Sequence, residues 1–192
     1  PVAKSLYIKE ISLHKAEVVL KVLEKQDTVQ HYLSGINLLL TDLSINENIT
    51  PLNFCSDLAV DTEHGESRST NGTHKMTFEK FRLSKAEHTL AFEQFSVLPQ
   101  IDEKAFFSRQ TVRVNYLSFR SPDIRLKGFD MEKLLDSGYL LADSLQMEKP
   151  TLKAIVNHYL PLPYRKILPH ELVQKARFLF DIKNVMIKDW DI

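Results

Sequence analysis

The chain of 192 residues is 43% hydrophobic and 26% charged, a composition typical of folded proteins rather than of disordered chains. Its 25 Lys and Arg residues equal its 25 Asp and Glu residues, so the formal net charge is zero. A nucleic-acid binder needs a dense basic surface that displaces counterions, and no such run of Lys and Arg occurs. No apolar run reaches the roughly 18–20 residues of a membrane span, and no signal peptide opens the sequence.

The first predicted strand has a sequence that returns 70 residues later. Residues 11–22 (ISLHKAEVVLKV) and 81–92 (FRLSKAEHTLAF) are identical at five of twelve positions. Weaker copies occupy 117–128 and 145–154, and a shortened copy occupies 185–192. Fixed self-similarity predicts a repeating architecture in which each unit buries its apolar face on its neighbours.

The dominant period along the chain is two. Apolar and polar residues alternate over 16–22, 54–60, 124–126 and 152–156. Such alternation predicts half-buried strands with one apolar and one polar face. Residues 21–37 fit a strand extension, a loop or a helical turn.

A second pattern, apolar-x-x-apolar-x-apolar, occurs seven times. Spacing by three in a strand puts two residues on opposite faces unless an extra residue intervenes, so the pattern predicts a bulge or kink at each occurrence. A helical stripe is the competing interpretation, but the many Phe, Val and Ile residues favour strands. The occurrences begin at Ile8, Leu40, Phe78, Phe92, Val114, Ala142 and Ile182.

Two short helices and two irregular segments complete the predicted elements. Asp130 as N-cap and Gly138 as terminator predict a helix between them, and Pro169 predicts a second one over 168–177. The polar stretch 61–74 is the clearest predicted loop, with Asn71-Gly72 as a turn signal between strands 53–61 and 75–83. The three prolines of 159–169 exclude a central strand there.

The sequence contains no catalytic or metal-binding motif of comparable strength. Cys55 is the single cysteine, which fits a small buried residue better than a nucleophile. The seven histidines show no ligand spacing. A hydrolytic site around His64 and His74 in the 61–74 loop is the weakest of three functional interpretations. We therefore predict no catalytic residue, no metal site and no cofactor.

The remaining candidate is the apolar face that the alternation creates. In one interpretation this face closes on a second sheet or a helix as an ordinary core. In the other, part of it stays open as a groove for phospholipid or other acyl chains, because continuous apolar area shielded from water is all that such a site needs. The candidate groove residues are Val18, Leu20, Val22, Leu90, Phe92, Ile124, Leu126, Leu152, Ala154 and Val156.

Residues 128–150 combine a short helix with a strand that ends at Pro150, after which an alternation resumes (LQMEKPTL over 145–152). A proline-rich segment, a helix and the strand 180–192 follow. This order, over about 75–192, resembles the AsmA/TamB-like superfamily of Gram-negative envelope proteins. Residues 1–74 fit as an earlier, looser repeat.

The resemblance implies a long, curved, mainly antiparallel β-sheet lined with apolar residues. Members extend into the periplasm from an N-terminal inner-membrane anchor and take part in outer-membrane homeostasis and phospholipid movement. The family offers no catalytic residues to carry over. Because the chain starts at Pro1 and stops at Ile192 within an alternation, we expect an internal piece of such a membrane-anchored protein.

We therefore expect a mainly β protein in which one elongated region, residues 1–192, forms a large curved, twisted antiparallel sheet with one or two short helices. The sheet is either an open groove or sandwich-like. The expected function is non-enzymatic: a periplasmic segment that presents an apolar groove to lipid acyl chains. The alternative is a closed β-sandwich that serves as a scaffold or protein-interaction module without a ligand.

Overall fold

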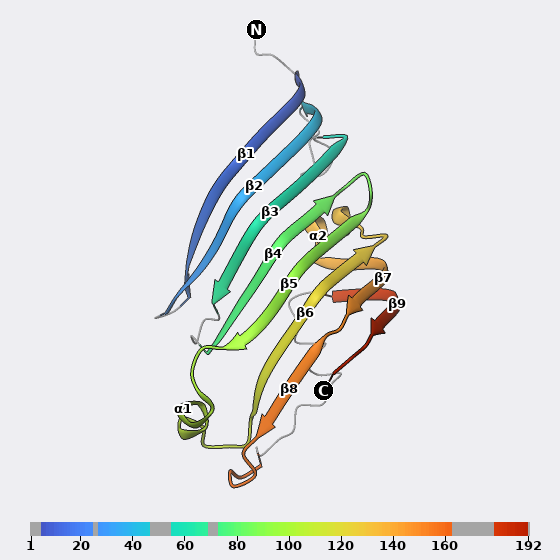
Figure 1. The fold of residues 1–192 in the computed structure, drawn as a ribbon. Helices are drawn as coiled ribbons and strands as arrows, with labels where there is room; N and C mark the ends of the chain where they lie inside the picture. Colours follow the sequence, from blue (N-terminus) through green and yellow to red (C-terminus); the bar gives the residue numbers. More distant parts are fainter. Residues whose placement is uncertain (1–4, 25–26, 47–54, 69–72, 163–178, 192) are drawn as a thin grey trace.

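The computed structural model describes residues 5–24, 27–46, 55–68, 73–162 and 179–191, which form one open, curved sheet with two short helices (Figure 1). Mainly β structure is therefore confirmed. The elements are β1 (Ser5–Glu24), β2 (Asp27–Asn46), β3 (Asp57–Arg68), β4 (His74–Ser84), β5 (Thr89–Pro99), α1 (Glu103–Ser108), β6 (Asn115–Lys127), α2 (Met131–Ser137), β7 (Tyr139–Glu148), β8 (Thr151–Val156) and β9 (Leu179–Lys188). Among the described residues no second sheet packs on this one, so the sandwich-like option is wrong for this part of the chain.

The strand order is β1-β2-β3-β4-β5-β6-β7-β9, and β8 pairs with the other end of β6. Pairing from β1 to β8 is antiparallel, but β9 runs parallel to β7, so the predicted antiparallel sheet is in fact mixed. A parallel pair needs a long crossover, and residues 149–178 provide the length for it. β7 and β8 follow one another along β6 and are separated at Lys149 and Pro150. Proline has no N–H for the ladder, which explains the break there.

A line of irregular backbone crosses the strands at one level, and we call it the crease. Six of its residues have φ between 46° and 63°, a left-handed conformation that inserts a bulge into a strand. The pairing register places the members beside one another on successive strands, except that Lys149 and Asp189 stand just past the ends of β7 and β9. They are Lys15, Gly35, Glu63, Lys80, Gln94, Pro122, Lys149 and Asp189, of which all but Glu63 and Pro122 have positive φ.

The predicted bulges are confirmed in two of the seven repeated patterns. Lys80 and Gln94 have positive φ just before the second apolar residue of their patterns, and the pairing of β4 with β5 shifts register at both. Asp42 has positive φ at the same position of its pattern, but the register between β1 and β2 passes it without a shift, so it is a kink and not a bulge. The patterns that begin at Ile8, Val114, Ala142 and Ile182 contain no left-handed residue, so the prediction is wrong for them. Among these, the pattern from Val114 begins one residue before β6 does, so Val114 itself is not in the strand.

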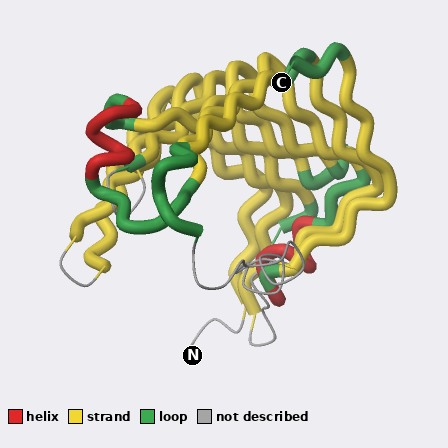
Figure 2. The backbone as a smooth tube through the Cα atoms, turned by 90° about the horizontal axis from the view of Figure 1, so that it is seen from below, coloured by secondary structure: helices red, strands yellow, loops and turns green. Residues whose placement is uncertain are grey.

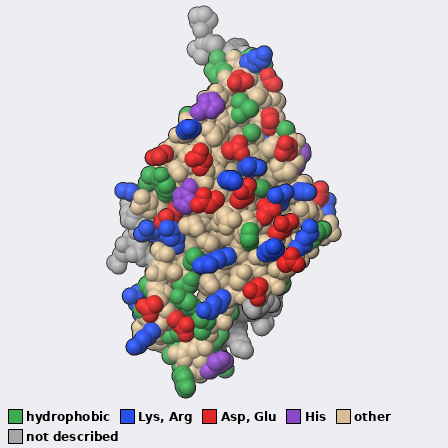
Figure 3. All heavy atoms as spheres, viewed as in Figure 1, with side chains coloured by type: hydrophobic (Ala, Val, Ile, Leu, Met, Phe, Trp, Pro, Cys, Tyr) green, Lys and Arg blue, Asp and Glu red, His purple; other side chains and the backbone are tan. Residues whose placement is uncertain are grey.

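The sheet arches so that its two faces differ in curvature as well as in chemistry. Figure 2 shows α2 on the inner, concave side of the arch. Buried Leu126, Phe129, Met131 and Ala142 form the core there, so α2 covers the concave face near β5, β6 and β7. Figure 3 shows the opposite, convex face, over which acidic and basic side chains are interspersed.

Both short helices begin at an aspartate N-cap. The helix predicted between Asp130 and Gly138 is confirmed as α2: the Asp130 carboxylate accepts a hydrogen bond from the Lys133 N–H at 2.9 Å, and Gly138 ends the helix with φ of 66°. The other helix, α1, is not among the predicted elements. Asp102 caps it in the same way, and Phe106 packs on Tyr116 with ring centroids 5.2 Å apart.

Residues 61–68 are strand rather than loop, which corrects the predicted 61–74 loop. Asp61 is paired with Arg82 and His64 with Glu79, so polar residues of β3 face polar residues of β4. Such cross-strand pairs stabilise a strand that has little apolar character of its own. Residues 21–24 and 27–37 belong to β1 and β2. The Asn71-Gly72 turn and the 168–177 helix lie outside the described residues.

Candidate functional site

One aliphatic side chain from each of eight strands joins a row across the concave face. Residues that are directly paired in neighbouring strands lie on the same face, so the register defines the row. It runs through Leu13, Leu38, Val60, Leu83, Leu90, Leu126, Leu145 and Val185. We call it the first apolar row.

A second row crosses the same face beyond the crease. It is less uniform, because His31 and Ser67 stand in it among apolar residues. Their side chains bond to each other, with the His31 Nδ1 2.8 Å from the Ser67 hydroxyl, so both polar groups are partnered. The second apolar row runs through Leu20, His31, Ser67, Met76, Val97, Phe119 and Leu152.

Phenylalanine rings fill the band between the two rows. Phe81 and Phe92 have centroids 5.0 Å apart, and Phe78 meets Phe92 edge-on at 5.2 Å. Phe95 continues the series to Phe119 at 6.2 Å. These tilted and edge-on contacts are the favourable geometry for aromatic pairs, so the concave face is apolar from one row to the other.

A glycine makes room for the far edge of the Phe78 ring. A side chain at Gly65, which is paired with Phe78, would collide with that ring. Gly65 is buried although β3 is a polar strand in sequence. The ring therefore takes the place of the missing side chain.

All ten candidate groove residues lie on the concave face. Val18, Leu20 and Val22 follow one another by alternation in β1, as Leu152, Ala154 and Val156 do in β8. In the middle strands Leu90 is paired with Leu126, and Phe92 with Ile124. The ten residues therefore share one face, even though bulges separate the segments.

The ten residues do not share one environment. Val18 and Leu20 are 47% and 54% exposed, whereas Leu126 is only 8% exposed and packs in the core with Phe129. We call the part under α2 the covered end and the part formed by β1 and β2 the open end. The open end offers uncovered apolar surface, and so does Val185 of β9 at the far end of the first apolar row, which is 58% exposed.

Two buried hydroxyls interrupt the apolar face. Ser121 donates to the Asp123 carbonyl at 2.9 Å. The Thr62 hydroxyl is buried and has no partner among the described residues. A buried hydroxyl without a hydrogen bond costs about 1–3 kcal/mol, so Thr62 is a weak point of this face. Nothing in the sequence distinguishes Thr62 from the other threonines.

Ion pairs cover the convex face. Lys80 lies 3.0 Å from Glu93, and Arg125 lies 2.9 Å from Asp123. Near them the surface has a hollow of about 520 Å³ lined largely by charged side chains. An acyl chain would have to desolvate these charges, so the hollow is unsuited to one.

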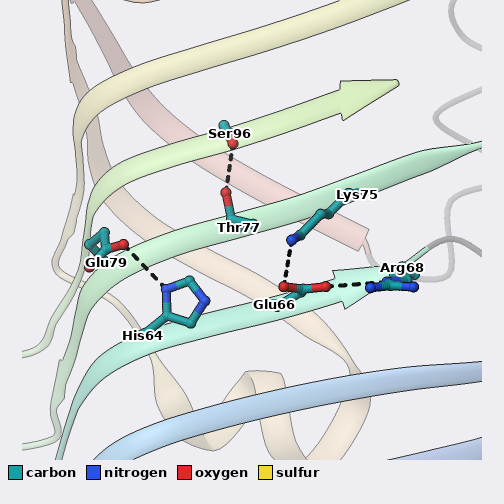
Figure 4. Close-up of polar contacts among 7 residues, drawn as sticks. All are labelled: His64, Glu66, Arg68, Lys75, Thr77, Glu79 and Ser96. Atoms are coloured by element: carbon teal, nitrogen blue, oxygen red, sulfur yellow. Dashed lines mark hydrogen bonds and ion pairs between the residues drawn. The ribbon is translucent and has the colours of Figure 1, made fainter. Parts of the chain in front are cut away.

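Farther along β3 and β4, polar side chains of the two strands contact one another (Figure 4). The His64 ring nitrogen Nδ1 lies 3.2 Å from the Glu79 carboxylate. Glu66 is held by Lys75 at 2.5 Å and by Arg68 at 3.2 Å. The hydrogen bond from Lys75, with help from Arg68, lowers the pKa of the Glu66 carboxyl below its ordinary value. The contacts of His64 with Glu79 and of Glu66 with Lys75 connect β3 to β4.

The described part of the chain contains no group of three His, Cys, Asp or Glu side chains that could hold a metal. Cys55 is buried, and burial raises the pKa of its thiol, which is the opposite of what a nucleophile needs. His64 is engaged by Glu79, and the His74 ring lies 2.9 Å from the Thr73 hydroxyl.

The described residues include no helix that is both long and apolar enough to cross a membrane. Comparison of the sequence with protein-family models and curated proteins, and of the fold with solved structures, finds no match. The concave face is therefore the candidate functional site.

Proposed function

We propose that the concave face binds lipid acyl chains at its open end and that the protein catalyses no reaction. The observation that carries the proposal is the run of apolar side chains that continues from the core to β1, where Leu13, Val18 and Leu20 are 45–54% exposed. Contiguous exposed apolar surface of this kind marks a binding site in a folded protein.

The energetics follow from the removal of apolar area from water. Each methylene that moves from water to an apolar surface contributes about 0.8 kcal/mol, so several methylenes offset the cost of immobilising a chain. The Phe78, Phe92 and Phe95 band offers a surface of the same character beside the open end. No charged side chain of β1 points to this face between Ile11 and Val22, which suits an uncharged hydrocarbon.

In a cell, the proposal places the chain in the periplasm as part of an inner-membrane-anchored, AsmA-like protein. A trough of this kind shields an acyl chain from water while it passes between membranes. Phospholipid is the proposed cargo, and the role is lipid transport or outer-membrane homeostasis. The support for this context is the resemblance of the sequence together with a curved sheet whose concave face is apolar.

The second candidate function is a scaffold or interaction module without a ligand. The covered end favours it, because Phe129 is 1% exposed and Leu126 is 8% exposed, so the face is an ordinary core there. Under this alternative the open end is a protein contact and no lipid binds.

A matched pair of variants tests the proposal. Leu20 and Val19 are neighbours in β1, are 54% and 52% exposed, and point to opposite faces. The delipidated protein is titrated with a fluorescent long-chain fatty acid. We expect Leu20→Glu to weaken binding by about tenfold or more, because a carboxylate enters the apolar path, and Val19→Glu to leave it nearly unchanged. Equal effects of the two variants, or no binding by the wild type, would contradict the proposal.

A further inference from the structure

The β1 strand is an unpaired edge of unusual length. It has 20 residues, and only its β2 side is paired within the described part of the chain (Figure 1). Natural proteins protect such edges with proline, inward-pointing charges or short strands. Between Glu10 and Lys21 the strand has no proline and no charge on its concave side, and one bulge at Lys15 is its only irregularity.

We infer that two copies of the chain pair antiparallel along their β1 edges, with Ala16 facing Ala16 of the second copy at a two-fold axis. The bulge fixes this alignment. In the pairing with β2, residues 14 and 15 together occupy the place opposite Asn37. On the free edge the same two residues would stand opposite one residue of the second copy, which is Glu17.

The resulting register matches apolar with apolar side chains on the concave face. Leu13 meets Val18 of the second copy, and Ile11 meets Leu20. Because a two-fold axis relates the copies, each of these contacts occurs twice. Leu13, Val18 and Leu20 are about half exposed in the single chain, so the pairing covers surface that is otherwise open to water.

The same register matches opposite charges on the convex face. Glu10 meets Lys21 of the second copy, and Glu17 meets the bulge with His14 and Lys15. All five side chains are exposed in the single chain and so are available for the contact. Opposite charges directly across a strand pair contribute about 0.2–1 kcal/mol, and like charges destabilise the pair.

Other registers lose this complementarity. A shift of one residue turns the apolar side chains of one copy toward the polar face of the other. A shift of two keeps the apolar match but sets Glu10 against Val19 or against residue 23, so its charge partner is lost. The charge pattern thus selects one alignment of the two copies.

The pairing would join two sheets into one and make their concave faces continuous. The first apolar row would pass from Leu13 to Val18 of the second copy, and the second row from Leu20 to Ile11. The inference does not rest on lipid binding, because backbone pairing and charge matching carry it. If the proposed function holds as well, one trough of double width results.

Charge reversal tests the register. Sedimentation equilibrium compares the full wild-type chain with Glu10→Lys, Lys21→Glu and the double variant that carries both. We expect a wild-type dimer, an increase in its Kd of about tenfold or more in each single variant, and recovery in the double variant. Asp136→Lys, on the exposed side of α2, is the control and leaves the Kd unchanged.

A monomer at about 100 µM, or a dimer whose Kd the single variants do not change, would overturn the inference. Failure of the double variant to recover would also overturn it, because it would mean another register. A second experiment is independent of charge. In a Cys55→Ser background, Ser12→Cys combined with Val19→Cys should give a disulfide-linked dimer on mild oxidation, since these positions face each other. Ser12→Cys alone should not, because its two copies would stand roughly 20 Å apart.

Discussion

The covered end and the open end of the concave face are built from the same kind of strand but have different physical properties. Leu126 and Leu20 both occupy apolar rows, yet one is 8% exposed and the other 54%. The difference comes from the chain between β6 and β7, which places Phe129 and α2 over the first residue and leaves the second without a cover. Alternation therefore identifies a face, and a segment elsewhere in the chain decides whether that face is a core or a surface.

The largest expected effect is a difference in stability between the same substitution made at the covered end and at the open end. Leu126→Glu places an unpaired carboxylate in the core beside Phe129, and we expect a loss of about 4 kcal/mol or more in the free energy of unfolding. Leu20→Glu places the same group on exposed surface and should cost less than about 1 kcal/mol. Urea denaturation followed by circular dichroism measures both. Similar losses in the two variants would mean that both ends are core.

A smaller change in the free energy of unfolding is expected for a substitution in the crease, which runs through both ends. Gln94 has φ of 50°, a conformation that costs a non-glycine residue about 1–2 kcal/mol. Gln94→Gly should therefore raise the free energy of unfolding by about 0.5–1 kcal/mol after the extra flexibility of glycine is subtracted. Ser118→Gly, in the extended backbone of β6, is the control and should lower stability. A loss in both variants would show that Gln94 is not strained.

The smallest expected effect is a change in the pH dependence of stability, caused by Glu66 on the convex face. The folded chain lowers the pKa of Glu66 below the ordinary 4.5, so this carboxylate stabilises the fold above pH 4.5 and the contribution is lost as pH falls through the lowered pKa. The pair is near the surface, so its contribution is less than about 1 kcal/mol. In the Lys75→Met variant, the free energy of unfolding should fall less steeply as the pH drops below 4.5. An unchanged slope in this pH range would show that the pair of Lys75 and Glu66 does not contribute to it.

The sequence predicted the features that depend on near neighbours. The caps of α2 at Asp130 and Gly138 are local, and so is the alternation that places Val18 and Leu20 on one face. The bulge at Gln94 was also predictable, because the three-residue spacing from Phe92 to Phe95 requires an extra residue if both rings are to share a face.

Features that depend on distant partners were not predictable in this way. The related segments 11–22 and 81–92 adopt different structures: the first is a continuous strand, and the second contains the turn between β4 and β5. In that turn the Asp57 carboxylate accepts from the Ala86 N–H at 2.9 Å, and the Lys85 ammonium donates to the Cys55 carbonyl at 3.0 Å. In the first segment the equivalent lysine, Lys15, has a different partner: its N–H donates to the Asn37 side chain on β2 at 3.2 Å. The same residues can therefore form a turn in one place and a strand in the other.

The cover over Leu126 is a further tertiary effect. A candidate list based on alternation joins core residues such as Leu90 and Leu126 to exposed ones such as Val18, because nothing local distinguishes them. The polar composition of residues 61–68 predicts a loop for the same reason, although they form a strand. Its stability comes from partners on β2 and β4, such as Arg82 opposite Asp61.

Photo-crosslinking in living cells of the source organism tests the central claim most directly. A photoreactive residue replaces Val18 or Leu20 on the concave face of the open end, Val19 on the convex face, and Leu126 in the covered core, and mass spectrometry identifies the adducts. The account predicts phospholipid adducts at Val18 and Leu20 and none at Val19 or Leu126. Only protein adducts at Val18 and Leu20, or lipid adducts that are as abundant at Val19, would contradict it.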